Sequence, residues 1–380
     1  MKVLHLGKYF PPHRGGMETH LQTLTRGLAS YAAIDVIVAA SNRQSSQEDV
    51  NGVRVTRASR LGAVAATPIC PSLLALVRQS KPDLVHIHHP HPFAMMAYLV
   101  SGASAPLVIT YQSDIVRQRI LGKAVAPMVE ATLRRASAIF VTSQEYLDTS
   151  PVLSRHREKC RLVPMGIEIG DRKCDRQLVK TLRNRFGSAI VLSVGRLVSY
   201  KGLQYLVRAM RDVSATLVVI GSGPEQRRLE SIVKRFNLQG RVHLIGDVDD
   251  IEPYYDACDI FVLPSISRNE AFGLVQLEAM AAGKPVINTA LDSGVPFVSR
   301  HNETGFTVRP RDESALADAI NLLLKDSALA DRFGRAAHAR LTALFSADAM
   351  VRRTFEVYEQ VLGKRTQGIE ARIESNKVEA

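Results

Sequence analysis

The sequence contains no tryptophan and only four cysteines among 380 residues. The cysteines form neither a CxxC pair nor a cluster with histidine, so neither a disulfide framework nor a structural zinc site is indicated. No apolar run reaches the ~18 uninterrupted residues that a membrane-spanning helix needs. The first residues lead directly into a strand pattern and do not resemble a signal peptide, so we expect a cytoplasmic protein.

Acidic residues are fewer than basic ones. The 49 Lys and Arg residues exceed the 37 Asp and Glu residues, which gives a formal net charge of +12. This excess favours anionic partners such as phosphates, nucleic acid or an acidic membrane surface, although an ordinary basic surface gives the same balance. Nucleic acid is disfavoured, because only 6% of the residues are aromatic and the basic residues form no recognised binding motif.

Short apolar runs alternate with helical patterns in two successive series. Near-continuous Val, Ile and Leu strands separated by helices predict an α/β fold with parallel sheets covered on both faces. Because the series restarts near the middle of a chain too long for one core, we expect two doubly wound, Rossmann-like domains that face each other across a cleft. The expected strands are residues 3–7, 35–39, 53–58, 84–88, 107–112, 139–142, 190–194, 216–220, 242–245, 260–263 and 286–289. The expected helices include residues 18–30, 72–80, 202–211, 225–236, 271–281 and 347–362.

Two carboxylates stand eight positions apart after one of these strands. Glu270 is expected at the start of a helix and Glu278 on that helix. Eight helical residues rise ~12 Å, whereas two carboxylates that act on one glycosidic bond lie ~5–10 Å apart. The spacing therefore favours two groups that hold opposite ends of an elongated, hydroxyl-rich ligand such as a nucleotide sugar.

Glycine-rich turns follow other strands. In the Gly195-Arg196 and Lys201-Gly202 pairs, two cations lie next to a predicted helix start, which can bind a diphosphate. A solvated loop with two basic residues explains the same pattern. The turn at 221–224 contains Gly223 but lacks the third glycine of a dinucleotide fingerprint, so a plain turn is the simpler interpretation. The loop at 11–18 contains the Gly15-Gly16 pair, which would allow a ligand to approach the backbone or form only a flexible turn.

Two further patterns are typical of metal sites but have simpler explanations. The Asp-x-Asp motif within residues 247–250 precedes a helix, where aspartate commonly caps the first turn. Four histidines lie between residues 86 and 91, but His86 and His88 point to one face of a strand with no acidic or cysteine ligand nearby in sequence. We expect strand-end residues that line the cleft, and no metal site.

In this order and spacing, the motifs resemble those of glycosyltransferase family 4, the retaining GT-B enzymes, and in particular bacterial mannosyltransferase-like enzymes of surface-polysaccharide synthesis. The resemblance covers nearly the whole chain. It rests on the glycine pair at 15–16, the segments 195–202 and 221–224, and the segments 264–286, 293–296 and 303–306.

The resemblance implies an organisation of the chain. Residues 1–168 would form an acceptor-binding domain, with the helix at about 347–363 packed back on it. Residues 176–346 would form the domain that binds the nucleotide sugar, and residues 364–380 a flexible tail.

The resemblance also implies roles for matching residues. Arg196 and Lys201 would bind the donor diphosphate, Glu270 the donor sugar, and Glu278 the ribose. Arg196, Lys201 and Glu270 would be the catalytic residues. The full donor set would be Gly195, Arg196, Lys201, Gly223, Glu270, Phe272, Gly273, Leu274, Val275 and Glu278.

On the opposite wall of the expected cleft, Gly15 and Gly16 would face the donor, with His88, Gln112 and Asp114 beside the acceptor. Gln112 is a departure, since relatives often carry histidine there. An amide cannot titrate, which suggests an altered sugar preference or weaker activity. A catalytically silent nucleotide-sugar-binding partner and a nucleotide-sugar epimerase remain alternatives.

The implied reaction needs no divalent metal or other cofactor, because cations and helix ends stabilise the leaving diphosphate. The donor would be GDP-mannose or a UDP-hexose, and the acceptor a glycan or a polyprenyl-diphosphate-linked oligosaccharide. A basic and apolar helical stretch could bring the protein to the inner face of the plasma membrane, or could be an ordinary amphipathic helix. Its basic residues are Arg117, Arg119, Lys123, Arg134 and Arg135.

Overall fold

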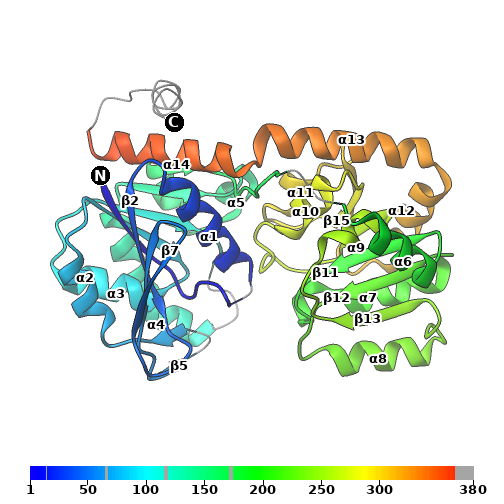
Figure 1. Cartoon of the computed structure of the whole chain (residues 1–380), viewed down its shortest axis with the longest axis horizontal. Coiled ribbons are helices and arrows are strands. Elements are labelled where there is room, and N and C mark those ends of the chain that lie inside the picture. Colours follow the sequence, from blue (N-terminus) through cyan, green and yellow to red (C-terminus); the bar gives the residue numbers. More distant parts are fainter. Residues whose placement is uncertain (14, 65–66, 115–118, 171–173, 364–380) are drawn as a thin grey trace. The chain divides into compact units, whose positions relative to one another are not determined.

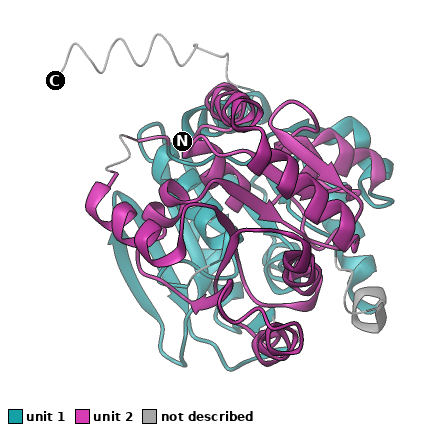
Figure 2. Ribbon diagram, turned by 90° about the vertical axis from the view of Figure 1, so that its right-hand side faces the viewer, with its two compact units in different colours: residues 1–142, 150–168, 347–380 teal, residues 143–149, 169–346 magenta. Residues whose placement is uncertain are grey.

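The computed structural model describes residues 1–13, 15–64, 67–114, 119–170 and 174–363. The chain divides into two compact units, coloured separately in Figure 2. Unit 1 comprises Met1–Thr142, Ser150–Glu168 and the C-terminal segment from Ala347, and unit 2 comprises Ser143–Thr149 and Ile169–Ser346. Each unit has its own sheet and its own hydrophobic core.

Unit 1 is built on an eight-stranded sheet with the order β10-β9-β8-β7-β1-β2-β4-β3. All neighbours are parallel except β3 and β4. The strand order reverses between β1 and β7, and ligands of doubly wound sheets bind at the carboxyl ends of strands at such a switch point. The strands are β1 (Lys2–Leu6), β2 (Ala33–Ala39), β3 (Ser46–Val50), β4 (Val53–Ala58), β7 (Leu84–His89), β8 (Leu107–Tyr111), β9 (Ala138–Val141) and β10 (Cys160–Leu162). A separate two-stranded antiparallel sheet pairs β5 (Gly62–Val64) with β6 (Thr67–Ile69).

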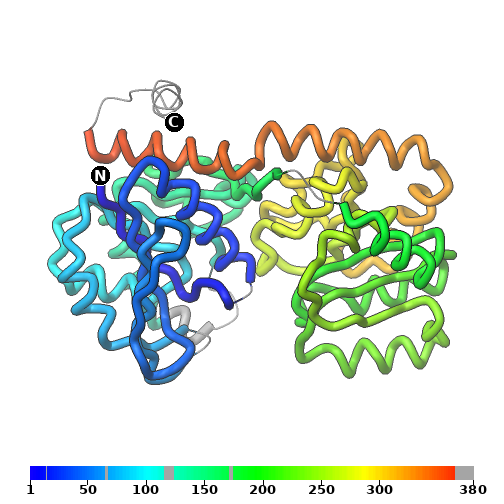
Figure 3. Tube along the Cα trace, in the orientation of Figure 1, coloured from blue at the N-terminus to red at the C-terminus, as the bar shows by residue number. Residues whose placement is uncertain are grey.

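The last helix of the described residues, α14 (Ala347–Val361), belongs to unit 1 and packs beside α1 (Gly16–Leu28) (Figures 1 and 3). Val351, Phe355 and Tyr358 recur at helical spacing and join the same buried core as β1, β2 and β4. The apolar stripe therefore fastens α14 to the elements at the beginning of the chain. The other helices of unit 1 are α2 (Leu73–Ser80), α3 (Pro92–Ser101), α4 (Arg119–Arg135) and the 3-10 helix η1 (Leu153–Lys159).

Unit 2 has a six-stranded, wholly parallel sheet with the order β13-β12-β11-β14-β15-β16. Its switch point lies between β11 and β14. The strands are β11 (Ile190–Val194), β12 (Thr216–Ile220), β13 (Val242–Gly246), β14 (Ile260–Leu263), β15 (Val286–Thr289) and β16 (Gly305–Val308). The α-helices are α5 (Gln144–Thr149), α6 (Arg176–Phe186), α7 (Leu203–Ala209), α8 (Gln226–Arg235), α9 (Glu252–Ala257), α10 (Val275–Ala281), α11 (Val295–Val298), α12 (Glu313–Lys325) and α13 (Ser327–Leu344). Two 3-10 helices, η2 (Ser199–Lys201) and η3 (Met210–Asp212), flank α7.

The prediction of a mixed α/β fold with parallel sheets is confirmed. One expected boundary is wrong, because Ser143–Thr149, placed in the first domain by sequence, groups with unit 2. The Arg268 guanidinium lies 5.1 Å from the Tyr146 ring centroid and donates a hydrogen bond to the Thr149 carbonyl at 3.1 Å. These contacts join residues more than a hundred positions apart, so no short segment of the sequence predicts them.

Within the described residues, no helix has both the length and the apolar character required to cross a membrane.

Replacing Phe355 with alanine tests the anchoring of α14. The side chain is fully buried and lies 5.3 Å from the Tyr31 ring. Loss of a buried phenylalanine costs about 3–5 kcal/mol, so Phe355→Ala should lower the free energy of unfolding by about that amount in urea denaturation. Arg352→Ala, at an exposed position of the same helix, is the control and should change it by less than ~0.5 kcal/mol. Equal effects of the two substitutions would contradict this packing.

Candidate functional site

The carboxyl edge of the unit 2 sheet carries two turns that pack backbone against backbone. The first follows β11 and the second follows β12. A Cβ atom at Gly221 would lie 2.2 Å from the Gly195 carbonyl oxygen, and one at Gly223 would lie 2.5 Å from that of Leu197. The Leu197 amide also donates to the Ser222 carbonyl at 2.8 Å. The predicted donor residue Gly223 is thus required for this close packing.

Lys201 is positioned by the turn after β11. It ends η2, and Gly202 follows with a φ of 67°. The stem of Lys201 packs along Gly195, where an added Cβ would lie 3.3 Å from Lys201 Cε. Its Nζ atom lies 2.6 Å from Oε2 of Glu270, and the two side chains are only 12% and 11% exposed. Two of the predicted catalytic residues therefore form a nearly buried ion pair at the switch point.

Glu270 is also held by the strand that precedes it. The Ser265 hydroxyl donates to Glu270 Oε2 at 3.0 Å, and the Ser265 carbonyl accepts from the Thr289 hydroxyl at 2.5 Å. Because β14 and β15 are neighbours, these bonds tie the carboxylate to two strand ends. The Glu270 Oε2 atom thus accepts from both the Lys201 ammonium group and the Ser265 hydroxyl group.

The prediction that one helix carries both Glu270 and Glu278 is wrong. Helix α10 begins at Val275, so Glu270 lies in the preceding turn while Glu278 lies on the helix. The turn is fixed instead by hydrogen bonds, including that from the Gly294 amide to the Ala271 carbonyl at 2.7 Å. The predicted donor residues Phe272, Gly273 and Leu274 occupy this turn, and Phe272 is buried.

Glu278 has a buried partner that the sequence analysis missed. The Tyr255 hydroxyl, from α9, donates to Glu278 Oε2 at 2.6 Å. Tyr255 is fully buried, whereas Glu278 is half-buried. The tyrosine therefore fixes one carboxylate oxygen. Arg196, in contrast, is exposed, with its guanidinium 3.4 Å from the Tyr200 hydroxyl.

The predicted residues of unit 1 lie at the carboxyl edge of its own sheet. Gln112 directly follows β8 and is buried, and neither side-chain atom has a hydrogen-bond partner among the described residues. Asp114 accepts hydrogen bonds from the Tyr111 hydroxyl at 2.7 Å and the Ser150 hydroxyl at 3.2 Å. These hydrogen bonds indicate a local structural role for Asp114. Gly15 precedes α1, and Gly16 is its first residue.

Four buried imidazoles gather at the β1/β7 switch point. His5 on β1 and His86 on β7 are register partners, with His88 two positions further on the same strand face and His20 on α1. Ligand atoms of His5, His86 and His88 all lie within 4.8 Å of one another. Burial lowers the pKa of His5 to about 3 and that of His20 to about 4, and it holds the pKa values of His86 and His88 well below the usual range. The imidazoles are therefore neutral near pH 7.

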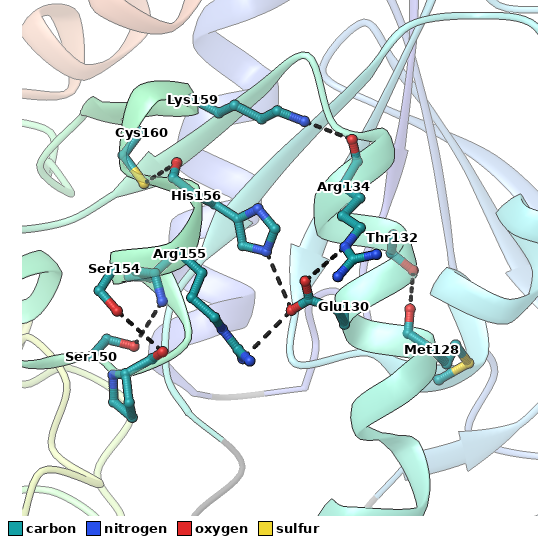
Figure 4. Close-up of polar contacts among 12 residues, drawn as sticks. Met128, Glu130, Thr132, Arg134, Ser150, Ser154, Arg155, His156, Lys159 and Cys160 are labelled. Atoms are coloured by element: carbon teal, nitrogen blue, oxygen red, sulfur yellow. Dashed lines mark hydrogen bonds and ion pairs between the residues drawn. The ribbon is translucent and has the colours of Figure 1, made fainter.

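The basic helix α4 is tied to η1 by one carboxylate (Figure 4). Glu130 accepts from Arg134 Nε at 2.9 Å, and its other oxygen lies 3.3 Å from His156 Nε2 and 3.5 Å from Arg155. These partners lower the pKa of the Glu130 carboxyl group, although burial opposes them. The helix end is thus fixed within unit 1.

This packing accounts for part of the predicted membrane-facing set. Arg134 pairs with Glu130, and Arg135 lies over the Tyr98 ring and donates to the Ala103 carbonyl at 3.0 Å. Arg117 lies outside the described residues. The contacts favour an ordinary packed helix at this end of α4.

Tyr255, Ser265, His5 and Tyr358 belong to these sites but were not predicted. Each acts through a partner at least five positions away in sequence. His5 lies in the strand expected over residues 3–7, but the pairing of that strand with the strand of His86 was not predicted.

Two family descriptions match the chain. Residues 14–170 match Glycosyltransferase Family 4, and residues 177–340 match Glycosyl transferases group 1. The O-antigen chain mannosyltransferase C of Escherichia coli is 31% identical over 96% of this chain and 100% of the relative. The D-rhamnosyltransferase WbpZ of Pseudomonas aeruginosa is 32% identical over 91% of this chain and 93% of the relative.

Solved structures share the fold. Sucrose-phosphate synthase from Thermosynechococcus elongatus superposes with a TM-score of 0.80 at 26% identity, covering 95% of this chain and 99% of that structure. Anabaena HepE in complex with UDP-glucose has a TM-score of 0.77 at 21% identity, covering 95% and 100%.

Gly202→Ala tests the turn that positions Lys201. The added Cβ would lie 2.1 Å from the Pro264 carbonyl oxygen, at a backbone φ that alanine disfavours. We expect a loss of at least about 2 kcal/mol in the free energy of unfolding, measured in urea. Gly240→Ala is the control, because a Cβ there meets no atom within 4 Å. A stability unchanged in both variants would show that this backbone contact is not rigid.

Proposed function

The chain belongs to glycosyltransferase family 4, and from this membership we propose that it transfers a hexosyl group from a nucleoside-diphosphate sugar to a hydroxyl group of a glycan. The observation that carries the proposal is the pairing of Lys201 with Glu270 at the switch point of unit 2. It brings a cation for phosphate and a carboxylate for sugar hydroxyls within one hydrogen-bond length of each other.

The reaction leaves negative charge on the departing diphosphate. Lys201 is fixed along Gly195 and against Glu270, so its ammonium group is in place before the bond breaks. The exposed guanidinium of Arg196, 3.4 Å from the Tyr200 hydroxyl, can bind phosphate oxygens in a bidentate manner. We propose that these two cations stabilise the leaving group without a divalent metal.

The second carboxylate would bind the other end of the donor. Tyr255 occupies one oxygen of Glu278, and a carboxylate can accept from several donors, so the group remains able to take ribose hydroxyls. The hydrogen bond also fixes the orientation of the carboxylate.

Retention of anomeric configuration is proposed through front-face substitution. The bond between the anomeric carbon and the diphosphate oxygen breaks, and the acceptor oxygen bonds to the same face of that carbon. The acceptor proton passes to the departing phosphate oxygen, so charge and atoms balance. Glu270 would hold sugar hydroxyls and orient the ring, with no covalent intermediate.

We propose GDP-mannose as the first donor to test, because the similar Escherichia coli protein is named a mannosyltransferase. A UDP-hexose is second, because HepE was solved with UDP-glucose. The acceptor would be a growing surface polysaccharide, either free or linked to polyprenyl diphosphate at the inner face of the plasma membrane.

A donor panel tests this function. Purified protein is incubated with GDP-mannose, UDP-glucose and other nucleotide sugars, and nucleoside diphosphate release is measured with and without an oligosaccharide acceptor. Acceptor-dependent release is expected. Binding without release would instead indicate a catalytically silent partner, and a changed sugar without release would indicate an epimerase.

Lys201→Ala and Glu270→Ala should each lower kcat for transfer by about 10²–10³-fold, because each removes a preorganised charge from the transition state. Initial rates with the active donor measure the effect. Lys325→Ala, at an exposed position in the last turn of α12, serves as the charge-matched control. Near-normal turnover of both site variants, with the fold intact by circular dichroism, would refute the assignment.

Tyr255→Phe should weaken binding of the free nucleoside diphosphate by roughly three- to tenfold, because Glu278 loses one hydrogen bond that fixes it. Isothermal titration calorimetry measures the change. Tyr254→Phe, a half-buried neighbour on the same helix, should leave the dissociation constant unchanged. An unchanged constant in Tyr255→Phe would rule out this role for Tyr255.

A further inference from the structure

Three of the four buried imidazoles at the switch point of unit 1, together with a tyrosine of α14 and Thr110, form one continuous chain of hydrogen bonds. His86 Nε2 lies 2.7 Å from the Thr110 hydroxyl, and His86 Nδ1 lies 2.5 Å from the Tyr358 hydroxyl. The same hydroxyl lies 3.4 Å from His5 Nε2, and His5 Nδ1 lies 3.1 Å from His88 Nε2. The chain of hydrogen bonds therefore runs from Thr110 to His86, then to Tyr358, His5 and His88.

This chain of hydrogen bonds ends at a buried ring nitrogen that has no partner among the described residues. His88 Nδ1 is buried and has no hydrogen-bond partner among the described residues, and the same holds for both ring nitrogens of His20 and both amide atoms of Gln112. The His20 and His88 ring centroids are 5.7 Å apart. Buried polar atoms are rarely left unpaired, so their concentration at a strand switch point indicates a polar ligand.

The distances favour one direction for the hydrogen bonds. Burial keeps the imidazoles neutral and raises the pKa of Tyr358 well above its ordinary value, so each ring carries one N–H and the phenol keeps its proton. Tyr358 donates to the nearer nitrogen, Nδ1 of His86, because imidazole nitrogen is a strong acceptor. In this arrangement His5 Nε2, which faces the phenol oxygen at 3.4 Å, carries the hydrogen and donates it to that oxygen.

The remaining tautomers follow in order. If His5 carries its hydrogen on Nε2, its Nδ1 is an acceptor and takes a hydrogen bond from His88 Nε2–H. His88 Nδ1 then carries no hydrogen, so its lone pair can accept a hydrogen bond. A bound metal ion fits poorly here, because both nitrogens of His5 and of His86 are already engaged by other side chains.

We propose that Tyr358 is a positioning residue that, through His5, sets the tautomer of His88, so that His88 Nδ1 accepts a hydrogen bond from a sugar hydroxyl bound at the carboxyl edge of unit 1. The inference rests on the proposed glycosyl transfer for the identity of the ligand, but not for the hydrogen-bond chain itself. It also gives α14 a part in ligand recognition.

The first test needs no substrate. Nitrogen-15 NMR of the full chain with labelled histidine, assigned through His88→Asn, should show His88 as the Nε2–H tautomer. In Tyr358→Phe, the His88 signal should move toward a mixture of tautomers. In Tyr98→Phe it should not move, because that hydroxyl, also buried in unit 1, donates to the Ala105 carbonyl and not to the chain.

A His88 spectrum unchanged by Tyr358→Phe would overturn the inference. So would one equivalent of zinc or nickel per chain in the purified protein, measured by mass spectrometry. An enzyme without transferase activity whose His88 signal still responds to Tyr358→Phe would refute the proposed function alone and leave the chain of hydrogen bonds intact.

The second test links the chain to activity. With the active donor and acceptor, Tyr358→Phe should lower kcat/KM by roughly three- to tenfold, the effect of one lost hydrogen bond, while Tyr98→Phe stays at the wild-type value. If Tyr358 acts through His88, its substitution should have no further effect in a His88→Ala background. Fully additive losses would show that Tyr358 acts by general stability alone and would contradict the proposal.

Discussion

The ion pair between Lys201 and Glu270 is the interaction on which the site of unit 2 depends. It joins the turn after β11 to the turn after β14, across the point where the strand order reverses. Little solvent reaches it, so neither charge could stay there without the other or a ligand. Gly202 supports this contact because it has no side chain to collide with the Pro264 carbonyl. The Ser265 hydroxyl supports it by donating a hydrogen bond that fixes the Glu270 carboxylate.

The two units present different chemistry at equivalent places. In unit 2 the switch point carries charges that are paired with each other, which favours a ligand that brings its own charge, such as a diphosphate. In unit 1 the switch point carries neutral imidazoles and an amide with open atoms, which favours uncharged hydroxyl groups. This division is consistent with a nucleotide sugar in unit 2 and a glycan in unit 1.

Sequence periodicity predicted the parallel sheets well, because buried parallel strands are short apolar runs between helices. Ile190–Val194, Thr216–Ile220 and Val286–Thr289 have the expected bounds. It failed at Glu270, where a hydrogen-bonded turn replaces the first part of the expected helix. It also could not find the contact of Tyr358 with His86, since 272 positions separate them and only the return of α14 brings them together.

The most direct test of the account is whether Glu270 recognises the sugar and not the nucleotide. Calorimetry would compare the active donor with its free nucleoside diphosphate, for wild-type protein and for Glu270→Gln. The account predicts that Glu270→Gln keeps most of its affinity for the nucleotide but loses the additional affinity that the sugar provides. An equal loss of affinity for both ligands would contradict it, because the carboxylate would then act on the phosphate site through Lys201 alone.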